Sequence, residues 1–172
     1  MEFLKIVLMS VGGAVVYGVM QDQVTARICV EYFTVGHPPV FATDSKTLLA
    51  LGWGALATWW YGLFLGIALG ASARWGARPR TRAITLRRPM FFILVRVACY
   101  TVIGGLIGYF AARQGWIRLI GPIAGRILPE REAAYIAVLW AHWTAYGSAA
   151  VEGIVFCFRT WRRRGAPARP AC

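Results

Sequence analysis

Four side chains that could bind a polar ligand or transfer a proton lie close together near the start of this chain. Asp22, Arg27, Glu31 and His37 bring both signs of charge and an imidazole within 16 residues, and Gln23 lies in the same polar run. Such a group could hold a small polar ligand, a metal ion or the loop of a partner. The spacing of Glu31 and His37 is not a recognised metal-binding motif, so the sequence by itself assigns no metal site.

A second imidazole, that of His142, lies inside an apolar stretch together with Tyr146. The two residues are four apart and therefore share one face of a helix. Counting the rise per residue along each predicted span puts His142 and Asp22 at a similar depth. A histidine beside a carboxylate could change its charge near neutral pH or bind a metal, whereas a lone buried histidine is commonly a hydrogen-bonded structural residue. The sequence leaves both interpretations open.

Two further ionisable residues, Arg96 and Glu152, interrupt other apolar stretches. Both lie about 9 Å from the predicted cytoplasmic boundary when depth is counted along a helix. Charged groups inside a membrane usually face other helices and pair with one another, so we predict an ion pair between Arg96 and Glu152. The alternative is that each side chain reaches separately to the headgroups.

Long apolar stretches must position these side chains. The 172-residue chain is 58% hydrophobic with a mean hydropathy of +0.54, and it runs 27 residues without a charge between Lys46 and Arg74. About 20 apolar residues suffice to cross a bilayer. The first stretch resembles a secretory signal peptide but lacks a clean cleavage site, so we expect a retained helix. We predict one domain, 1–158, with spans at 3–20, 47–73, 90–112 and 133–158, followed by a basic tail, 159–172.

The arginines predict how these spans are threaded through the membrane. Six of them lie between residues 74 and 88, and five more follow residue 158. Basic connections face the cytoplasm, so we expect both termini there and an all-α fold, an integral membrane four-helix bundle. The net charge of +12 does not indicate nucleic acid, because the arginines flank the spans instead of alternating with stacking aromatic residues.

Glycines at every fourth position predict where helices approach one another closely. Small residues at this spacing let helix backbones touch, which drives association inside a bilayer. The predicted packing glycines are Gly62, Gly66 and Gly70 in one span and Gly104 and Gly108 in the next. They indicate contacts within one bundle, with a second copy or with another protein.

The first predicted outer connection resembles that of a known group of proteins. Residues 22–27 (DQVTAR), 31–34 (EYFT) and 36–39 (GHPP) are similar to the outer loop of a family of small uncharacterised bacterial membrane proteins with about four spans. The resemblance covers mainly residues 17–65. It implies a bacterial inner (cytoplasmic) membrane location and draws attention to the polar residues of this loop, but it implies no activity.

Three functions are compatible with these patterns. The sequence has no glycine-rich phosphate loop, nucleophile elbow or H-E-x-x-H motif, so it assigns no catalytic residue and no cofactor. The first hypothesis is an accessory subunit that docks onto a larger membrane complex or a second copy. The second is a protein that binds or transports an ion or small ligand at the outer polar cluster. The third is a membrane metalloenzyme that uses His37, His142 and Glu31. The expected partners are the lipid bilayer and either another membrane protein or a second copy of the chain.

Overall fold

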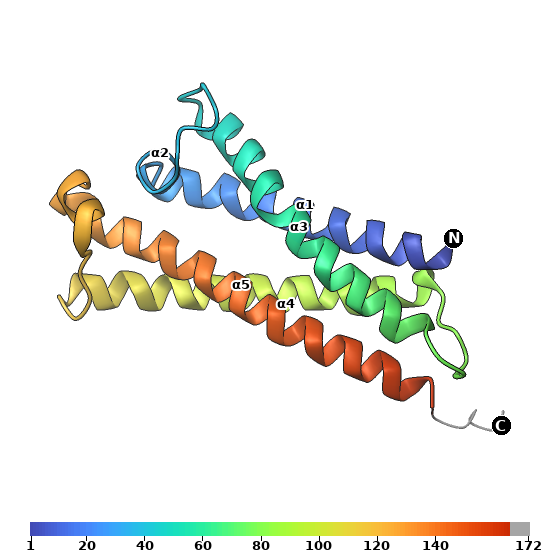
Figure 1. The fold of residues 1–172 in the computed structure, drawn as a ribbon. Coiled ribbons are helices and arrows are strands. Elements are labelled where there is room, and N and C mark those ends of the chain that lie inside the picture. The colour runs from blue at the N-terminus through green and yellow to red at the C-terminus, as the bar shows by residue number, and fades with distance from the viewer. Residues whose placement is uncertain (166–172) are drawn as a thin grey trace.

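The computed structural model describes residues 1–165, and these residues form helices joined by short connections, without β-strands (Figure 1). Four of the helices are long, one is a single turn, and one is a short 3₁₀ helix. Their bounds are Glu2–Ile28 for α1, Glu31–Thr34 for α2, Lys46–Arg74 for α3, Ala83–Arg113 for α4, Gly121–Arg126 for η1 and Pro129–Arg163 for α5.

Three of the long helices, α1, α3 and α4, are each long and apolar enough to cross a membrane, with 27, 29 and 31 residues. This marks the chain as a multi-pass membrane protein. The fourth long helix, α5, has 35 residues but carries more polar side chains and does not meet the same criterion of apolarity. The prediction of an all-helical membrane fold is therefore confirmed. The predicted fourth span, in α5, has a weaker hydropathy signal than the other three.

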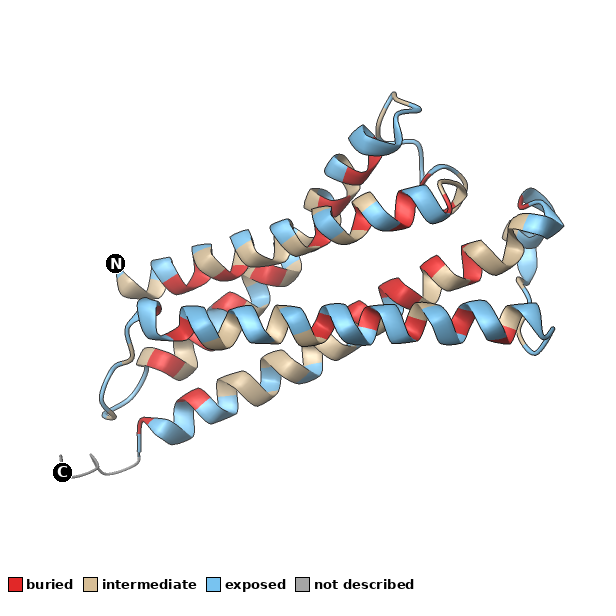
Figure 2. Cartoon of the chain, turned by 180° about the vertical axis from the view of Figure 1, so that it is seen from behind, coloured by how far each residue is buried: buried red, intermediate tan, exposed pale blue. Residues whose placement is uncertain are grey.

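The long helices pair as two antiparallel hairpins. Helix α1 packs along α3 and α4 packs along α5, while contacts between α3 and α5 and between α1 and α4 join the hairpins (Figure 1). Seen from behind, the buried residues of the long helices lie mainly along the seams between them, and their outer faces are exposed (Figure 2). Many of these exposed residues are large and apolar, which is the pattern of a surface that faces lipid.

Glycines line both hairpin seams. A Cβ atom at Gly62 would lie 2.8 Å from the carbonyl oxygen of Ser10 on α1, so only glycine permits this approach of α3. In the other hairpin, a Cβ atom at Gly108 would lie 2.7 Å from the ring of Trp140 on α5. Gly66 and Gly70 likewise pack against α1, and Gly104 packs against Thr144. The predicted glycine ridges therefore serve contacts within this chain.

The first helix is longer than predicted. The apolar pattern predicts a span that ends at residue 20, with Asp22 and Arg27 in a connection, but α1 continues to Ile28. Residues 21–28 contain no glycine or proline that would end a helix, and Arg27 donates a hydrogen bond to the side-chain oxygen of Gln23 one turn earlier. The polar residues thus continue the helix beyond the apolar run.

The other helices also extend beyond the predicted spans. Helix α4 begins at Ala83, ahead of the predicted start at residue 90, and contains Pro89 within its length. Helix α5 covers 129–163, so residues 159–163 of the predicted tail are helical. Residues 166–172 of that tail lie outside the described part of the chain.

One end of the helix assembly carries most of the arginines, and we call residues 1–5, 74–88 and 159–165 the arginine-rich end. Arg164 is buried there, and its guanidinium donates hydrogen bonds to backbone carbonyl groups at the end of α3 and in the following connection. These acceptors belong to Ser72, Trp75, Arg78 and Pro79. Arg78 also stacks over the ring of Trp161, 3.8 Å from its centroid, so this end of α5 is tied to the connection between α3 and α4.

Candidate functional site

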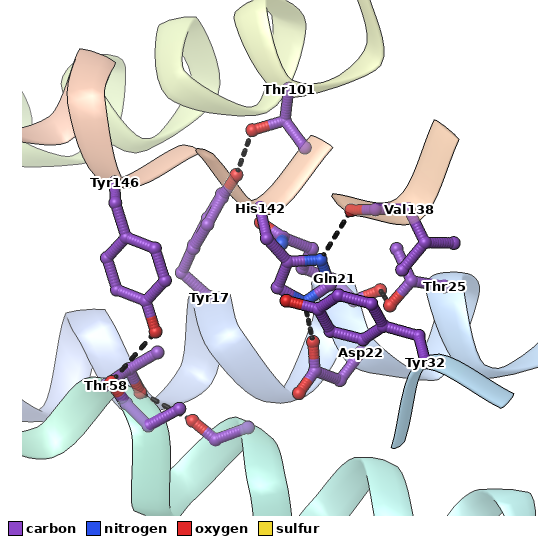
Figure 3. A network of polar contacts seen from close by, with 12 residues as sticks. Tyr17, Gln21, Asp22, Thr25, Tyr32, Thr58, Thr101, Val138, His142 and Tyr146 are labelled. Carbon is purple, nitrogen blue, oxygen red and sulfur yellow. Dashed lines mark hydrogen bonds and ion pairs between the residues drawn. The ribbon is translucent and has the colours of Figure 1, made fainter. Parts of the chain in front are cut away.

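At the opposite end, a buried pair of ionisable side chains joins the two hairpins. His142 Nε2 on α5 lies 3.0 Å from Asp22 Oδ1 on α1, and the two residues are 8% and 5% exposed (Figure 3). The sequence analysis placed these residues at a similar depth. The structure adds that they face each other.

The second ring nitrogen of His142 determines how protons are arranged in this pair. Nδ1 lies 2.8 Å from the carbonyl oxygen of Val138, which can only accept, so Nδ1 carries a hydrogen atom (Figure 3). One further proton is then shared between Nε2 and the Asp22 carboxyl group. The pair is neutral overall whether that proton resides on His142 or on Asp22, which makes its burial tolerable.

Aromatic rings from the short helix α2 cover the pair. The ring of Tyr32 stacks on the His142 imidazole with 4.5 Å between centroids (Figure 3). Phe33 meets the same imidazole edge-on, with 6.1 Å between centroids. His37 donates from Nδ1 to the carbonyl oxygen of Tyr32, and its ring lies 4.6 Å from that of Trp53. We call residues 29–37 the aromatic plug, because they separate the pair from the adjoining end of the molecule.

An ion pair anchors the aromatic plug to α5. The guanidinium of Arg131 makes two hydrogen bonds to Glu31, at 2.9 and 3.1 Å, and a third to the carbonyl oxygen of Ile28. The hydrogen bonds from Arg131 lower the pKa of Glu31 from 4.5 to about 2. Burial raises the pKa of the neighbouring Cys29 thiol to about 11, so this cysteine stays protonated at neutral pH.

A cavity of about 180 Å³ lies between the hairpins, with the His142–Asp22 pair in its wall. All four long helices contribute to the wall, which is mostly apolar and rich in small residues. Among the predicted ligand-binding residues, four line it: Asp22, His37, His142 and Tyr146. A mostly apolar cavity with a few polar groups is the usual form of a small-molecule site.

One polar atom in this cavity wall has no hydrogen-bond partner. The side-chain oxygen Oε1 of Gln21 is buried, and no donor within residues 1–165 reaches it. Such an atom costs free energy unless a donor satisfies it, and native structures contain few of them. Gln21 precedes Asp22 in the sequence, so both acceptors lie at the same end of the cavity.

Three tyrosine hydroxyl groups around the cavity are already engaged. Tyr17 Oη lies 2.7 Å from Thr101 Oγ1, which links α1 to α4 (Figure 3). Tyr146 donates to the carbonyl oxygen of Ala57, and Tyr61 donates to that of Tyr146. These last two bonds use the hydroxyl hydrogens on the protein itself. Tyr146 and Tyr61 can therefore offer the cavity only the acceptor sites of their hydroxyl oxygens.

The rest of the predicted outer cluster lies elsewhere. Gln23 donates a hydrogen bond to the backbone oxygen of Thr47, and Arg27 donates one to the hydroxyl group of Thr47, both 3.1 Å long. These two side chains therefore hold α1 against the start of α3. Glu31 is occupied by Arg131. Neither Gln23 nor Arg27 lines the cavity. Closeness in sequence predicts one site for these residues, but Gln23 and Arg27 lie on a different face of α1 from Asp22, and Glu31 lies in α2.

The predicted partners Arg96 and Glu152 meet on α4 and α5. The guanidinium makes two hydrogen bonds to the carboxylate, both 2.7 Å long. The Arg96 side chain remains 43% exposed and that of Glu152 15% exposed. Neither side chain extends alone toward the end of the helix assembly, so the paired arrangement holds in this structure.

The residues proposed for a metal site are kept apart by other bonds. Within residues 1–165, no three His, Cys, Asp or Glu side chains gather in a geometry that could hold a metal ion. Glu31 binds Arg131 and His142 binds Asp22. His37 alone of the proposed trio has a ring nitrogen without a protein partner in the described chain.

Several site residues escaped the sequence analysis. Gln21, Tyr17 and Tyr32 line the cavity, and Arg131 anchors the plug, yet none was singled out. Arg131 carries a readable signal, since it lies two residues before the predicted span 133–158 and therefore at the same end as Glu31. Tyr17 lies four residues before Gln21, which places these two residues on the same face of α1.

A comparison of the chain with family models, with curated proteins and with solved structures finds no match. The fold and the apolar helices define the class, a multi-pass helical membrane protein. Its function has to be inferred from the cavity and the polar groups that line it.

Proposed function

We propose that all four long helices cross the membrane as one bundle. Helix α5 packs along α4, and its 35 residues extend about 50 Å, more than a hydrocarbon core about 30 Å thick requires. The polar residues that reduce its hydropathy are paired with other helices: His142 with Asp22, and Glu152 with Arg96. Polar groups inside a membrane are tolerated when they are paired in this way.

The orientation follows from the arginines. The arginine-rich end lies in the cytoplasm, and the aromatic plug lies at the outer face. The first residues of the chain and the end of α5 both lie at the arginine-rich end (Figure 1). Trp116 and Ile120, which are 81% and 87% exposed in the connection between α4 and α5, then lie at the outer headgroup level. The resemblance of the outer loop favours a bacterial inner membrane.

The function best supported by the geometry is the binding of a small, mostly apolar molecule that carries a hydrogen-bond donor. The unpartnered Oε1 of Gln21 in the cavity wall is the observation that carries this proposal. An apolar wall favours an apolar ligand body, and an open acceptor favours a hydroxyl or amine group on it. The volume of about 180 Å³ suits a molecule with roughly one ring, since a cavity of about 150 Å³ admits benzene.

The His142–Asp22 pair gives this site a second property. Because the pair shares one proton, a ligand hydroxyl that donates toward Asp22 would shift that proton toward His142. This shift moves the shared proton within the pair and leaves the net charge of the pair at zero. This corresponds to the second sequence-based hypothesis, a ligand- or ion-handling protein.

The accessory-subunit hypothesis stays a prediction. The glycine ridges that suggested docking lie against helices of the same chain, so they no longer favour an external partner. A binding partner would instead have to use the exposed apolar faces of the helices, which lipid also covers.

Filling the cavity tests the proposal. Ala149 lines the cavity, whereas Val151, two residues along α5, is 63% exposed on the outside. We expect a small molecule to co-purify with the wild-type protein in mild detergent and to be absent from Ala149→Phe. The matched variant Val151→Phe should retain it. The measurement is mass spectrometry of organic extracts, normalised to protein.

Two results would contradict the proposal. One is an extract of the wild-type protein that contains only bulk lipid and detergent. The other is equal recovery of the same molecule from Ala149→Phe and wild type, with helical content unchanged by circular dichroism, because a phenylalanine ring would occupy the space that the ligand needs.

A further inference from the structure

A second cavity, of about 470 Å³, opens between α4 and α5 at the arginine-rich end. It shares only Ile93 and Phe156 with the wall of the cavity that contains the His142–Asp22 pair. The proposed ligand site therefore does not account for it.

The charges in this second cavity do not balance. Three arginines, Arg96, Arg159 and Arg163, line it together with one acid, Glu152. Glu152 is fully engaged by two hydrogen bonds from Arg96. Arg159 and Arg163 are four residues apart and thus on one face of α5, and within residues 1–165 neither guanidinium has an ion-pair partner. The cavity consequently presents two uncompensated positive charges.

Apart from three threonines, Thr81, Thr85 and Thr160, the remaining wall is apolar. Pro89 and Phe92 from α4 and Val155 from α5 lie alongside the arginines. A site with two guanidinium groups beside an apolar surface complements a molecule that is anionic at one end and hydrocarbon at the other. Guanidinium groups also match the geometry of phosphate oxygens, with which they form paired hydrogen bonds.

We propose that this cavity binds one anionic phospholipid. The phosphate lies between Arg159 and Arg163, and the first part of an acyl chain lies against Phe92 and Val155. The ion pair between Arg96 and Glu152 keeps the inner side of the cavity neutral, so the attraction is concentrated on the two arginines that are nearer the end of α5. An apolar wall would gain nothing from free phosphate, and this favours a lipid as the source of the anion.

Native mass spectrometry of the purified full chain, titrated with defined lipids, tests this assignment. The probes are dioleoylphosphatidylglycerol, dioleoylphosphatidylcholine and inorganic phosphate. The test variant is Arg159→Gln with Arg163→Gln. The control is Arg87→Gln with Arg162→Gln, which removes the same charge from exposed residues at the same end that do not line the cavity.

We expect wild type and control to retain one phosphatidylglycerol more tightly than phosphatidylcholine. The test variant should lose roughly thirtyfold in apparent affinity for phosphatidylglycerol, as two basic residues contributing about 1 kcal/mol each imply. Equal losses in both double variants would overturn the assignment, because they would indicate diffuse attraction. Binding of inorganic phosphate with the same affinity as phosphatidylglycerol would also overturn it.

Discussion

The molecule holds an acid–base pair near each end, and the two pairs are built differently. Asp22 and His142 join different hairpins, and their side chains are only 7% and 10% exposed. Arg96 and Glu152 join the two helices of one hairpin, and the arginine is 43% exposed. After the proposed orientation, we call Asp22–His142 the outer pair and Arg96–Glu152 the inner pair. The outer pair is buried away from alternative partners, so it specifies how the hairpins meet. The inner pair has solvent or headgroups as alternatives, and it mainly neutralises charge within a surface rich in arginine.

Breaking the outer pair should have the largest effect. Asp22→Leu leaves the His142 imidazole with a lost partner in a buried site, and we expect the free energy of unfolding to fall by about 3 kcal/mol. The double variant Asp22→Leu with His142→Leu should recover part of this loss, because no buried polar group is then unpaired. Unfolding in mixed micelles with increasing SDS measures both.

The neighbouring Gln23 provides the control for this prediction. Gln23→Leu changes a side chain on another face of α1 and should cost much less. A double variant that is at least as unstable as the sum of the two single variants would show that the pair does not couple the hairpins.

The inner pair should be coupled more weakly. A double-mutant cycle of Arg96→Gln and Glu152→Gln should give a coupling free energy of about 1 kcal/mol, because the exposed guanidinium keeps other partners. The same cycle on Asp22 and His142, measured in the same micelles, supplies the comparison. An inner coupling equal to or larger than the outer one would remove the distinction between the two ends.

The anchor of the aromatic plug should respond to acid. The pKa of Glu31 is lowered from 4.5 to about 2, so its stabilising contribution is present above pH 4.5 and is lost as the pH falls toward about 2. Amide hydrogen exchange of residues 29–37, corrected for the intrinsic pH dependence, should speed up over this range. The effect should be the smallest of the three, because Glu31 is partly exposed.

The variant Glu31→Gln separates this effect from general acid unfolding. It should exchange faster at neutral pH and show no further step between pH 4.5 and 2 in the plug. If wild type and variant respond identically to acid, the Glu31–Arg131 ion pair does not hold the plug in place.

The sequence predicts only part of this structure. It indicates how deep in the membrane a residue lies, but not in which direction its side chain faces around the helix. Counting residues from the cytoplasmic ends of the predicted spans pairs Arg96 with Glu152, and the contact is present. The same counting placed Asp22 and His142 at one depth but could not tell whether they face each other, since azimuth depends on how α1 rotates against α3. The glycine ridges fix that rotation, and their partners appear only in three dimensions.

The outer polar cluster illustrates the limit more sharply. Closeness in sequence predicts one site for Asp22, Arg27 and Glu31, but the continued helix turns Asp22 and Arg27 in different directions, and Glu31 lies in α2, where Arg131 binds it. Whether a buried amide such as that of Gln21 has a hydrogen-bond partner depends on all the side chains around it, so no local sequence pattern can predict it. The helices could thus be predicted, while the cavity could not.

The most direct test of the proposed site compares phenol with benzene, two rings that differ by one hydroxyl group. Phenol should raise the melting temperature of the detergent-solubilised wild-type protein more than benzene at equal concentration, because its hydroxyl group donates to Gln21. One hydrogen bond contributes about 1 kcal/mol, or roughly a fivefold difference in affinity. Gln21→Met should abolish this preference, and Ala149→Phe should abolish both shifts. Equal shifts with the two rings in the wild-type protein, or a phenol preference that persists in Gln21→Met, would contradict the account.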